Sequence, residues 1–334
     1  MDWALILEWA IKSAILIAIL VTGFAYTTFY ERRLLARIQV RVGPNRAGPF
    51  GFLQPAADGI KLIFKEELIP AAAYKLVFIL APIITVLPAL VITAVVPWGD
   101  SVELFGRSIP LVIADINVGI LYILSVASIS VYGIVLAGWS SNNKYAMLGG
   151  LRSSAQMLSY EIALGLAFVG PMLIAGSMSL TDIVNAQQRI WFIVFQPLGA
   201  FIFYVAMLAE VNRAPFDMPE AEQELTAGYH TEYSGMKFAL FFMGEYLKMI
   251  AVSAIFASLF LGGFRGPFVD QYPLLGPIYL LIKIAASLGI MIWIRATLPR
   301  LRYDRLMAFG WKVLLPLSLL NVFLTAVVIV LLGA

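Results

Sequence analysis

The residues best able to do chemistry gather in one acidic segment. Positions 210–232 carry a single arginine, Arg213, and six carboxylates, which are Glu210, Asp217, Glu220, Glu222, Glu224 and Glu232. Carboxylates that crowd together in a low-dielectric site cannot all ionise, so some of them titrate near neutral pH and can exchange protons. The alternative interpretation is a solvated acidic helix or a docking surface for a basic partner. The residue pattern alone leaves both open.

A short helix is expected within this segment. Asp217, followed three residues later by Glu220, resembles an N-cap and its partner at the third helical position. The helix would begin at Met218. Glu220 and Glu224 would then share one face, where like charges destabilise a helix by about 0.2–0.5 kcal/mol.

Two further carboxylates, Glu161 and Glu245, lie in apolar runs that are long enough to cross a membrane. An ionisable group at the centre of a bilayer costs about 2.5–3.5 kcal/mol, and such groups commonly mark ion or proton paths. Lys248 follows Glu245 at helical spacing, so a structural ion pair is the alternative for Glu245. The one histidine, His230, is a candidate for proton transfer or ligation, against the alternative of a satisfied polar residue.

The composition limits the cofactors that the chain itself can hold. It contains no cysteine and one histidine. These counts exclude disulfides, cysteine-ligated iron–sulfur clusters, cysteine-based zinc sites and a bis-histidine haem within the chain. We expect no haem, flavin, iron–sulfur cluster or metal to be bound here, so the cofactors of any electron transfer would belong to partners.

Membrane-spanning helices are the elements that must position these residues. Of the 334 residues, 61% are hydrophobic and 13% are charged, whereas soluble domains have about 25% charged residues. Runs near 20 residues long match a hydrocarbon core of about 30 Å. We therefore expect an all-α polytopic membrane protein, a single transmembrane domain over residues 1–334. Its approximately eight spans are predicted at about 10–30, 76–97, 114–138, 159–177, 191–209, 238–262, 274–295 and 312–332.

The basic residues predict the orientation. Of the 23 Lys and Arg residues, 17 fall in loops after odd-numbered spans and four in the other loops. Basic residues concentrate on the cytoplasmic side. Both termini are therefore expected on the outer (periplasmic) side, and the cytoplasmic loops are 31–75, 139–158, 210–237 and 296–311. The net charge of +3 reflects this topology and gives no support for nucleic acid binding.

The first of these loops contains an amphipathic segment. Residues such as Ala56, Ile60 and Phe64 recur at helical spacing, while Asp58 and Lys61 lie on another face. This pattern predicts a helix that lies in the membrane interface. The alternative is a helix that packs under the bundle for support alone.

Long stretches of these inside loops resemble one family. They are similar to the H-type (mitochondrial subunit 1 type) membrane subunit of respiratory complex I, the proton-pumping NADH:quinone oxidoreductase. The stretches that carry the resemblance are 31–45, 48–58, 61–66, 138–161, 210–232 and 294–307.

The resemblance implies eight spans, a surface helix at about 54–66, and a tunnel for the tail of ubiquinone or menaquinone. The surface helix and the first and sixth spans would frame the entrance. The residues implied at the cavity or its entrance are Arg32, Arg41, Asp58, Phe64, Glu66 and Arg295. The implied proton-coupling carboxylates are Glu31, Glu161, Glu210, Asp217, Glu220, Glu222, Glu224, Glu232 and Glu245, with His230 and Arg300 as further candidates.

The resemblance also implies partners. These are the iron–sulfur and quinone-site subunits of a peripheral arm, small membrane subunits, antiporter-like pump subunits and membrane lipids. A bacterial plasma (inner) membrane is expected in preference to an organellar one. Two alternatives remain, a mainly scaffolding subunit and the equivalent subunit of a membrane-bound hydrogenase.

Overall fold

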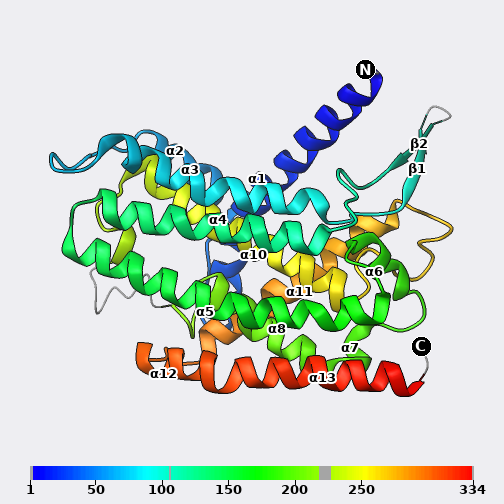
Figure 1. The fold of residues 1–334 in the computed structure, drawn as a ribbon. Helices are drawn as coiled ribbons and strands as arrows, with labels where there is room; N and C mark the ends of the chain where they lie inside the picture. Colours follow the sequence, from blue (N-terminus) through cyan, green and yellow to red (C-terminus); the bar gives the residue numbers. More distant parts are fainter. Residues whose placement is uncertain (1–2, 105–106, 218–226, 333–334) are drawn as a thin grey trace.

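The chain folds into a bundle of long helices (Figure 1). The computed structural model describes residues 3–104, 107–217 and 227–332. Within these ranges, seven helices are long and apolar enough to cross a membrane. Six of them are α1 (Trp3–Ile38), α3 (Lys75–Ile92), α4 (Gly119–Ser140), α5 (Lys144–Ala175), α10 (Gly235–Phe260) and α11 (Leu275–Thr297). The seventh runs from α12 (Tyr303–Phe309) through a π-helical turn (Gly310–Leu314) into α13 (Leu315–Leu332). The all-α polytopic membrane fold is confirmed.

The region of the expected fifth span differs from a full-length span. It forms a four-residue helix, α7 (Phe192–Phe195), and a 14-residue apolar helix, α8 (Pro197–Glu210). Pro197 lacks the N–H that would continue α7, and a residue before proline avoids helical geometry. Gln196 accordingly has φ −129° and ψ 57°. The sequence predicts about eight spans, because the run at 191–209 is long enough to be read as one continuous helix.

The remaining elements are short. On the side of α1 lie a 3₁₀ turn (Pro49–Gly51) and α2 (Gln54–Ile63), in the region expected as an amphipathic surface helix. A second 3₁₀ turn (Thr93–Val95) precedes an antiparallel hairpin of β1 (Ser101–Leu104) and β2 (Arg107–Pro110), which pairs Val102 with Ile109. The others are α6 (Leu180–Ala186) and the 3₁₀ turn η3 (Gly228–His230).

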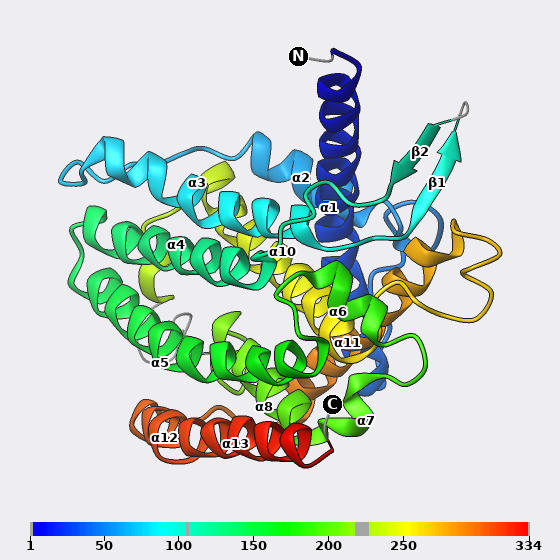
Figure 2. The same cartoon turned by 45° about the vertical axis from the view of Figure 1, so that its right-hand side comes forward.

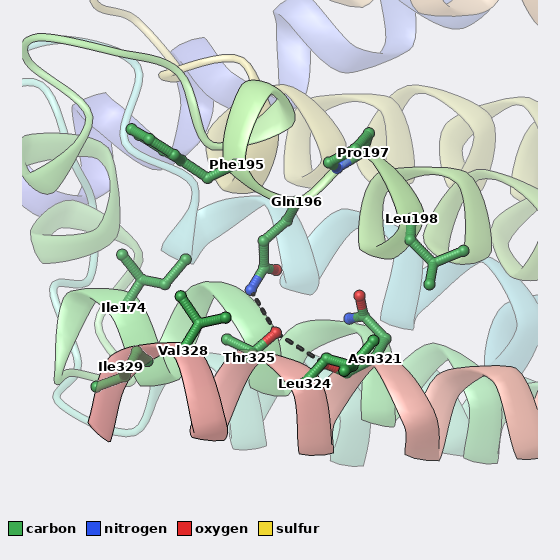
Figure 3. Close-up of a pocket in the computed structure, with 10 residues that line it drawn as sticks. All are labelled: Ile174, Phe195, Gln196, Pro197, Leu198, Asn321, Leu324, Thr325, Val328 and Ile329. Atoms are coloured by element: carbon green, nitrogen blue, oxygen red, sulfur yellow. Dashed lines mark hydrogen bonds between the residues drawn. The ribbon is translucent and has the colours of Figure 1, made fainter. Parts of the chain in front are cut away.

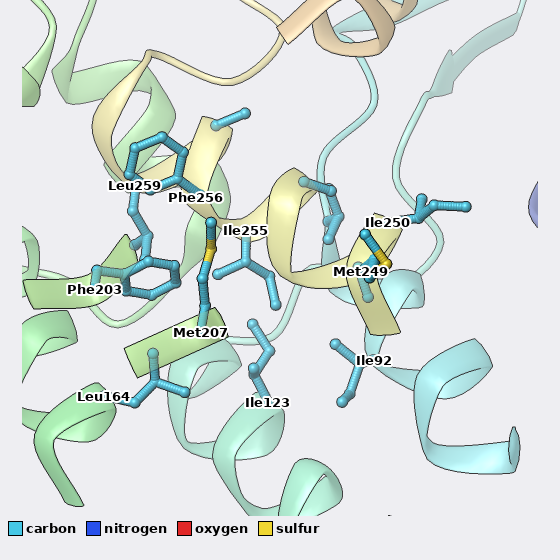
Figure 4. Close-up of a cluster of buried hydrophobic side chains, with 14 of the residues drawn as sticks. Ile92, Ile123, Leu164, Phe203, Met207, Met249, Ile250, Ile255, Phe256 and Leu259 are labelled. Carbon is cyan, nitrogen blue, oxygen red and sulfur yellow. The ribbon is translucent and has the colours of Figure 1, made fainter. Parts of the chain in front are cut away.

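The long helices pack in a continuous order. α3 packs on α4, α4 on α5, and α5 on both α8 and α13, while α10 contacts α3, α11 and α1. Figures 1 and 2 show α3, α4, α5 and α13 as successive layers, with α1 beside them at a steep angle and its N-terminal end projecting away. The core lies between α8 and α10, where Phe203, Met207 and Leu259 meet Ile123 and Leu164 (Figure 4).

One close backbone approach fixes the start of the segment before α10. A Cβ atom added at Gly149 of α5 would lie 2.7 Å from the Cα atom of Gly228. Gly228 itself has φ 62°, in the left-handed region that favours glycine. The two glycines therefore let η3 lie directly on α5, at the end of the acidic segment.

Candidate functional site

The centre of the candidate site is an ion-pair cluster around Arg213, which follows α8. Its Nη1 atom lies 3.3 Å from Oε1 of Glu31 on α1, and its Nε atom lies 2.6 Å from Oε1 of Glu245 on α10. The three side chains are 7%, 4% and 12% exposed, respectively. Burial alone would lower the pKa of Arg213, but the two carboxylates outweigh it and raise the pKa. Arg213 is therefore a permanent positive charge that joins α1 to α10.

Tyr246 and Arg295 complete this group, and we call the five residues Glu31, Arg213, Glu245, Tyr246 and Arg295 the Arg213 cluster. The Tyr246 hydroxyl donates to Oε2 of Glu31 at 2.6 Å, and its ring centroid lies 4.5 Å from the Arg213 guanidinium carbon. Arg295 of α11 donates to Oε1 of Glu31 and is 35% exposed, so it connects the cluster to the surface. Two carboxylates face two guanidinium groups, and this balance offsets the cost of burying them.

The loop that carries Arg213 is held on two sides. Gln156 of α5 donates through Nε2 to two backbone carbonyl oxygens within 209–216, at 2.9 and 2.7 Å. Asp217 accepts through Oδ2 from Nη2 of Arg300 at 2.5 Å. The loop is thereby tied to α5 and to the segment between α11 and α12, so Arg213 has little freedom to leave its carboxylates.

Glu210 lies beside internal cavities. Its side chain is buried and its Oε2 atom has no hydrogen-bond partner. Glu210 and Lys248 of α10 line two voids of about 40 and 20 Å³, and Glu245 borders the smaller one. A water molecule needs roughly 10–15 Å³ of such space. The cavities are thus large enough for water between Glu210, Lys248 and the Arg213 cluster.

The other predicted carboxylates lie in separate pairs. Glu161 of α5 accepts from the Ser128 hydroxyl on α4, and Glu232 accepts from Nδ2 of Asn143 at 2.6 Å. His230 is buried among aromatic rings, with the centroid of Phe238 5.5 Å away. These groups surround the acidic segment without joining the Arg213 cluster directly.

The six residues predicted at the cavity or its entrance fall into three groups. Nη1 of Arg32 donates to Oδ2 of Asp58 at 2.7 Å, which links α1 to α2. Arg295 belongs to the Arg213 cluster. Arg41, Phe64 and Glu66 are exposed and join neither group, and Phe64 is 84% exposed.

A lateral crevice of about 300 Å³ separates α1 from α10 and α11. A shallower groove of about 470 Å³ continues from it over α1 and shares Gly23 and Tyr26. The walls are mostly apolar, and they include Leu20, Thr27, Tyr30, Trp98, Ile250, Ile284 and Leu288. Thr27 of α1 and Ile250 of α10 line the crevice, and Glu31 and Tyr246 lie one helical turn beyond them on the same faces. The crevice therefore points along α1 toward the Arg213 cluster, although none of the five cluster residues lines it.

Some predicted residues lie outside the described ranges. These are Glu220, Glu222 and Glu224, together with the short helix expected from Met218. Conversely, sequence reasoning did not select Arg213, Tyr246 or Gln156 as site residues. Two signals were available: Arg213 is the single arginine of the acidic segment, and Tyr246 follows the intramembrane Glu245. For Gln156 the sequence holds no such signal. In the part of the chain that the structure describes, His, Asp and Glu form no group of three or more that could hold a metal ion.

Comparison with known proteins decides the family. The model of the family described as NADH dehydrogenase matches residues 11–326. The chain belongs to this family. It is 52% identical to the H subunit of NADH-quinone oxidoreductase from Thermomicrobium roseum, over 98% of both chains. It is 54% identical to the H subunit of the enzyme from Protochlamydia amoebophila, over 91% of this chain and 92% of that one. It is also 52% identical to the H 2 subunit of the enzyme from Syntrophobacter fumaroxidans, over 94% and 93% of the two chains.

Proposed function

We propose that this chain is the membrane subunit that admits quinone to a proton-translocating NADH-quinone oxidoreductase and couples quinone reduction to proton movement. The observation that carries the proposal is the apolar crevice along α1, which points toward the buried and charge-balanced Arg213 cluster. The curated relatives, named as the H subunit of NADH-quinone oxidoreductase over nearly their full length, support the same role.

The physical argument begins with the tail of the substrate. An isoprenoid tail needs an apolar path that opens sideways to the bilayer, with a few polar groups at its inner end. The crevice between α1, α10 and α11 has this character. Two residues beyond Tyr30 on α1, Arg32 pairs with Asp58 of α2. The substrate would be ubiquinone or menaquinone. The headgroup would be reduced against iron–sulfur and quinone-site subunits of a peripheral arm, since this chain has no cysteine to hold a cluster.

Coupling would use the buried acids. Reduction of a headgroup near Arg295 changes the local charge and hydrogen bonding, to which Glu31 responds because it accepts from Arg295, Arg213 and Tyr246. Glu210 and Lys248, across the water-sized cavities, would then exchange protons with that cluster. Such a redistribution biases a conformational switch that neighbouring pump subunits read. The complex would lie in a bacterial inner membrane.

The test uses Glu31→Gln and Glu210→Gln variants of the assembled complex, reconstituted in vesicles. We expect slower NADH:quinone turnover for the first and fewer protons moved per electron for the second. The matched control is Glu103→Gln, an exposed carboxylate on β1. Normal turnover and normal proton pumping in both test variants would remove the Arg213 cluster and Glu210 from the mechanism.

A scaffolding role is the competing function. The exposed apolar side chains of Phe64, Ile60 and Ile63 on and beside α2 favour a partner or lipid surface there. If the two Glu→Gln variants lower the amount of assembled complex but leave the turnover of the remaining complex unchanged, the scaffolding function explains the acids better.

A further inference from the structure

A second groove shares no lining residue with the crevice along α1. It has a volume of about 430 Å³ and lies between the end of α5, the break between α7 and α8, and α13. Figure 3 shows its lining residues, none of which belongs to α1, α10 or α11: Ile174, Phe195, Gln196, Pro197, Leu198, Asn321, Leu324, Thr325, Val328 and Ile329. It lies at the end of the bundle that holds the C-terminus and the β1–β2 hairpin (Figure 1).

The groove opens outward beside α13. Within Tyr303–Leu331, which includes α13, only 17% of an apolar 18-residue stretch is buried within the chain. Leu324 and Val328, which line the groove, are 47% and 51% exposed. In a membrane these side chains face lipid or another subunit. Where they face lipid, an amphiphile can enter the groove from the side.

Its inner wall carries buried amides in a fixed arrangement. Nε2 of Gln196 donates to Oγ1 of Thr325 at 3.0 Å, and that hydroxyl donates in turn to the carbonyl oxygen of Asn321 at 2.7 Å. The hydroxyl proton of Thr325 is already used in the bond to Asn321, so Thr325 can only accept from Gln196. The side-chain amide of Gln196 must therefore point its nitrogen at Thr325 and its oxygen away. Figure 3 shows this chain of bonds running from the α7–α8 break to α13.

Two polar atoms at this wall are left without a partner. Oε1 of Gln196 and Nδ2 of Asn321 are buried and make no hydrogen bond, although the two residues are only 4% and 6% exposed. A Cβ atom added at Gly199 would lie 3.2 Å from the first atom and 3.1 Å from the second. Both atoms therefore lie beside Gly199, at the inner wall of the groove. A buried acceptor and a buried donor that remain unpaired are costly, so a group that bonds to both is favoured at this wall.

The chemistry of that group follows from its surroundings. None of the described residues that line the groove carries a charge, so an ionised headgroup would lose its hydration without a counter-charge from them. A neutral hydroxyl fits, because its O–H donates to Oε1 of Gln196 while its oxygen accepts from Nδ2 of Asn321. The apolar body of the same molecule would lie between Phe195, Leu198 and Leu324.

We propose that this groove binds a neutral, hydroxyl-bearing membrane lipid, such as a long-chain or isoprenoid alcohol or a diacylglycerol. Gly170 and Gly199 leave the space that the buried amides need, since a Cβ atom at Gly170 would overlap Oε1 of Gln196. The site is separate from the proposed quinone path, so its test does not depend on that function.

The test uses photolabelling of the intact complex in lipid nanodiscs. The probe is 1-hexadecanol carrying a diazirine and an alkyne, and the labelled peptides are mapped by mass spectrometry. We expect saturable labelling within 192–198 and 321–329, which excess unlabelled dioleoylglycerol competes away. The matched hexadecane probe, which lacks the hydroxyl, should label these peptides at least about fivefold less. This is the loss of affinity expected when one neutral hydrogen bond to the ligand is removed.

Asn321→Leu is the decisive variant. It removes an amide nitrogen that has no partner in the fold, so the protein should assemble, and labelling by the alcohol should fall about fivefold or more. The matched control is Ser125→Leu, a polar-to-apolar change on an exposed face of α4. Equal labelling by the alcohol and the hydrocarbon, or unchanged labelling in Asn321→Leu, would overturn the proposal. So would cross-linking of these peptides to a neighbouring subunit in place of the lipid.

Discussion

The Nε atom of Arg213 lies 2.6 Å from the Oε1 atom of Glu245, inside the bundle. This contact fastens the loop after α8 to α10. Because Arg213 also reaches Glu31 of α1, one side chain connects three segments that are far apart in the sequence. The acidic segment, α1 and α10 therefore share a single electrostatic centre.

Removal of the arginine should be costly. In Arg213→Gln, Glu31 and Glu245 lose their shared counter-charge in a buried site, which typically costs about 3–5 kcal/mol. We expect a large drop in assembled complex on native gels and a lower melting temperature. Arg305→Gln, at an exposed position of α12, is the matched control and should leave both unchanged. A normal yield of Arg213→Gln complex would show that the cluster contributes little to folding.

The charge of Arg213 should also be independent of pH in the working range. The pKa of Arg213 is raised in the folded protein by the two carboxylates, so the stability that this charge contributes is fully present below the pKa of an arginine in the unfolded chain, far above the working range. The difference in melting temperature between wild type and Arg213→Gln should therefore not fall from pH 7 to pH 9. A steady decline of that difference over this range would mean that the arginine loses its proton there.

Removing the Tyr246 hydroxyl disturbs the Arg213 cluster less than removing the arginine does. Tyr246→Phe removes the donor to Glu31 at 2.6 Å while it keeps the ring under Arg213. A hydrogen bond to a charged group contributes about 1.5–3 kcal/mol. We expect the complex to assemble, to melt at a lower temperature and to reduce quinone several-fold more slowly. Tyr132→Phe, at a position that is 66% exposed, should match wild type in both measurements.

Much of the fold could be predicted from the sequence, because apolar runs near 20 residues long have few alternatives to membrane helices. The break at Gln196–Pro197 was missed, since the run at 191–209 is apolar apart from Gln196 and proline also occurs inside α3 and α5. The hairpin at 101–110 was missed as well. Each strand has only four residues, so the hairpin leaves only a weak pattern in the sequence.

The candidate site was only partly predictable. Glu245 and Glu161 were found because charge in an apolar run is unusual, and the sequence placed Lys248 as the natural partner of Glu245. The structure gives Glu245 the partner Arg213, a contact between distant segments that spacing along one helix cannot reveal. The lipid groove was not predicted at all, because Gln196 and Asn321 are 125 positions apart and neither is charged.

Backbone contact between α5 and η3 should be sensitive to a single methyl group. In Gly149→Ala the added Cβ would lie 2.7 Å from the Cα atom of Gly228, where backbone must move. We expect η3 and the acidic segment to shift, with less assembled complex and faster proteolysis between 210 and 232. Gly59→Ala on α2 is the matched control, since nothing lies within 4 Å of its added Cβ. Equal protease resistance of the two variants would contradict this packing argument.

Because Glu210 and Lys248 line the same two cavities, the effect of a substitution at Glu210 on complex assembly should depend on Lys248. Both residues line both voids, so neutralising either one alone leaves the other charge in a mostly apolar space without its neighbour. We expect Glu210→Gln and Lys248→Met each to lower the amount of assembled complex. The double variant should recover much of that loss, because interacting neighbours are not additive. Quantitative native gels of the four proteins measure this coupling, and purely additive losses would mean that the two side chains do not interact across the cavities.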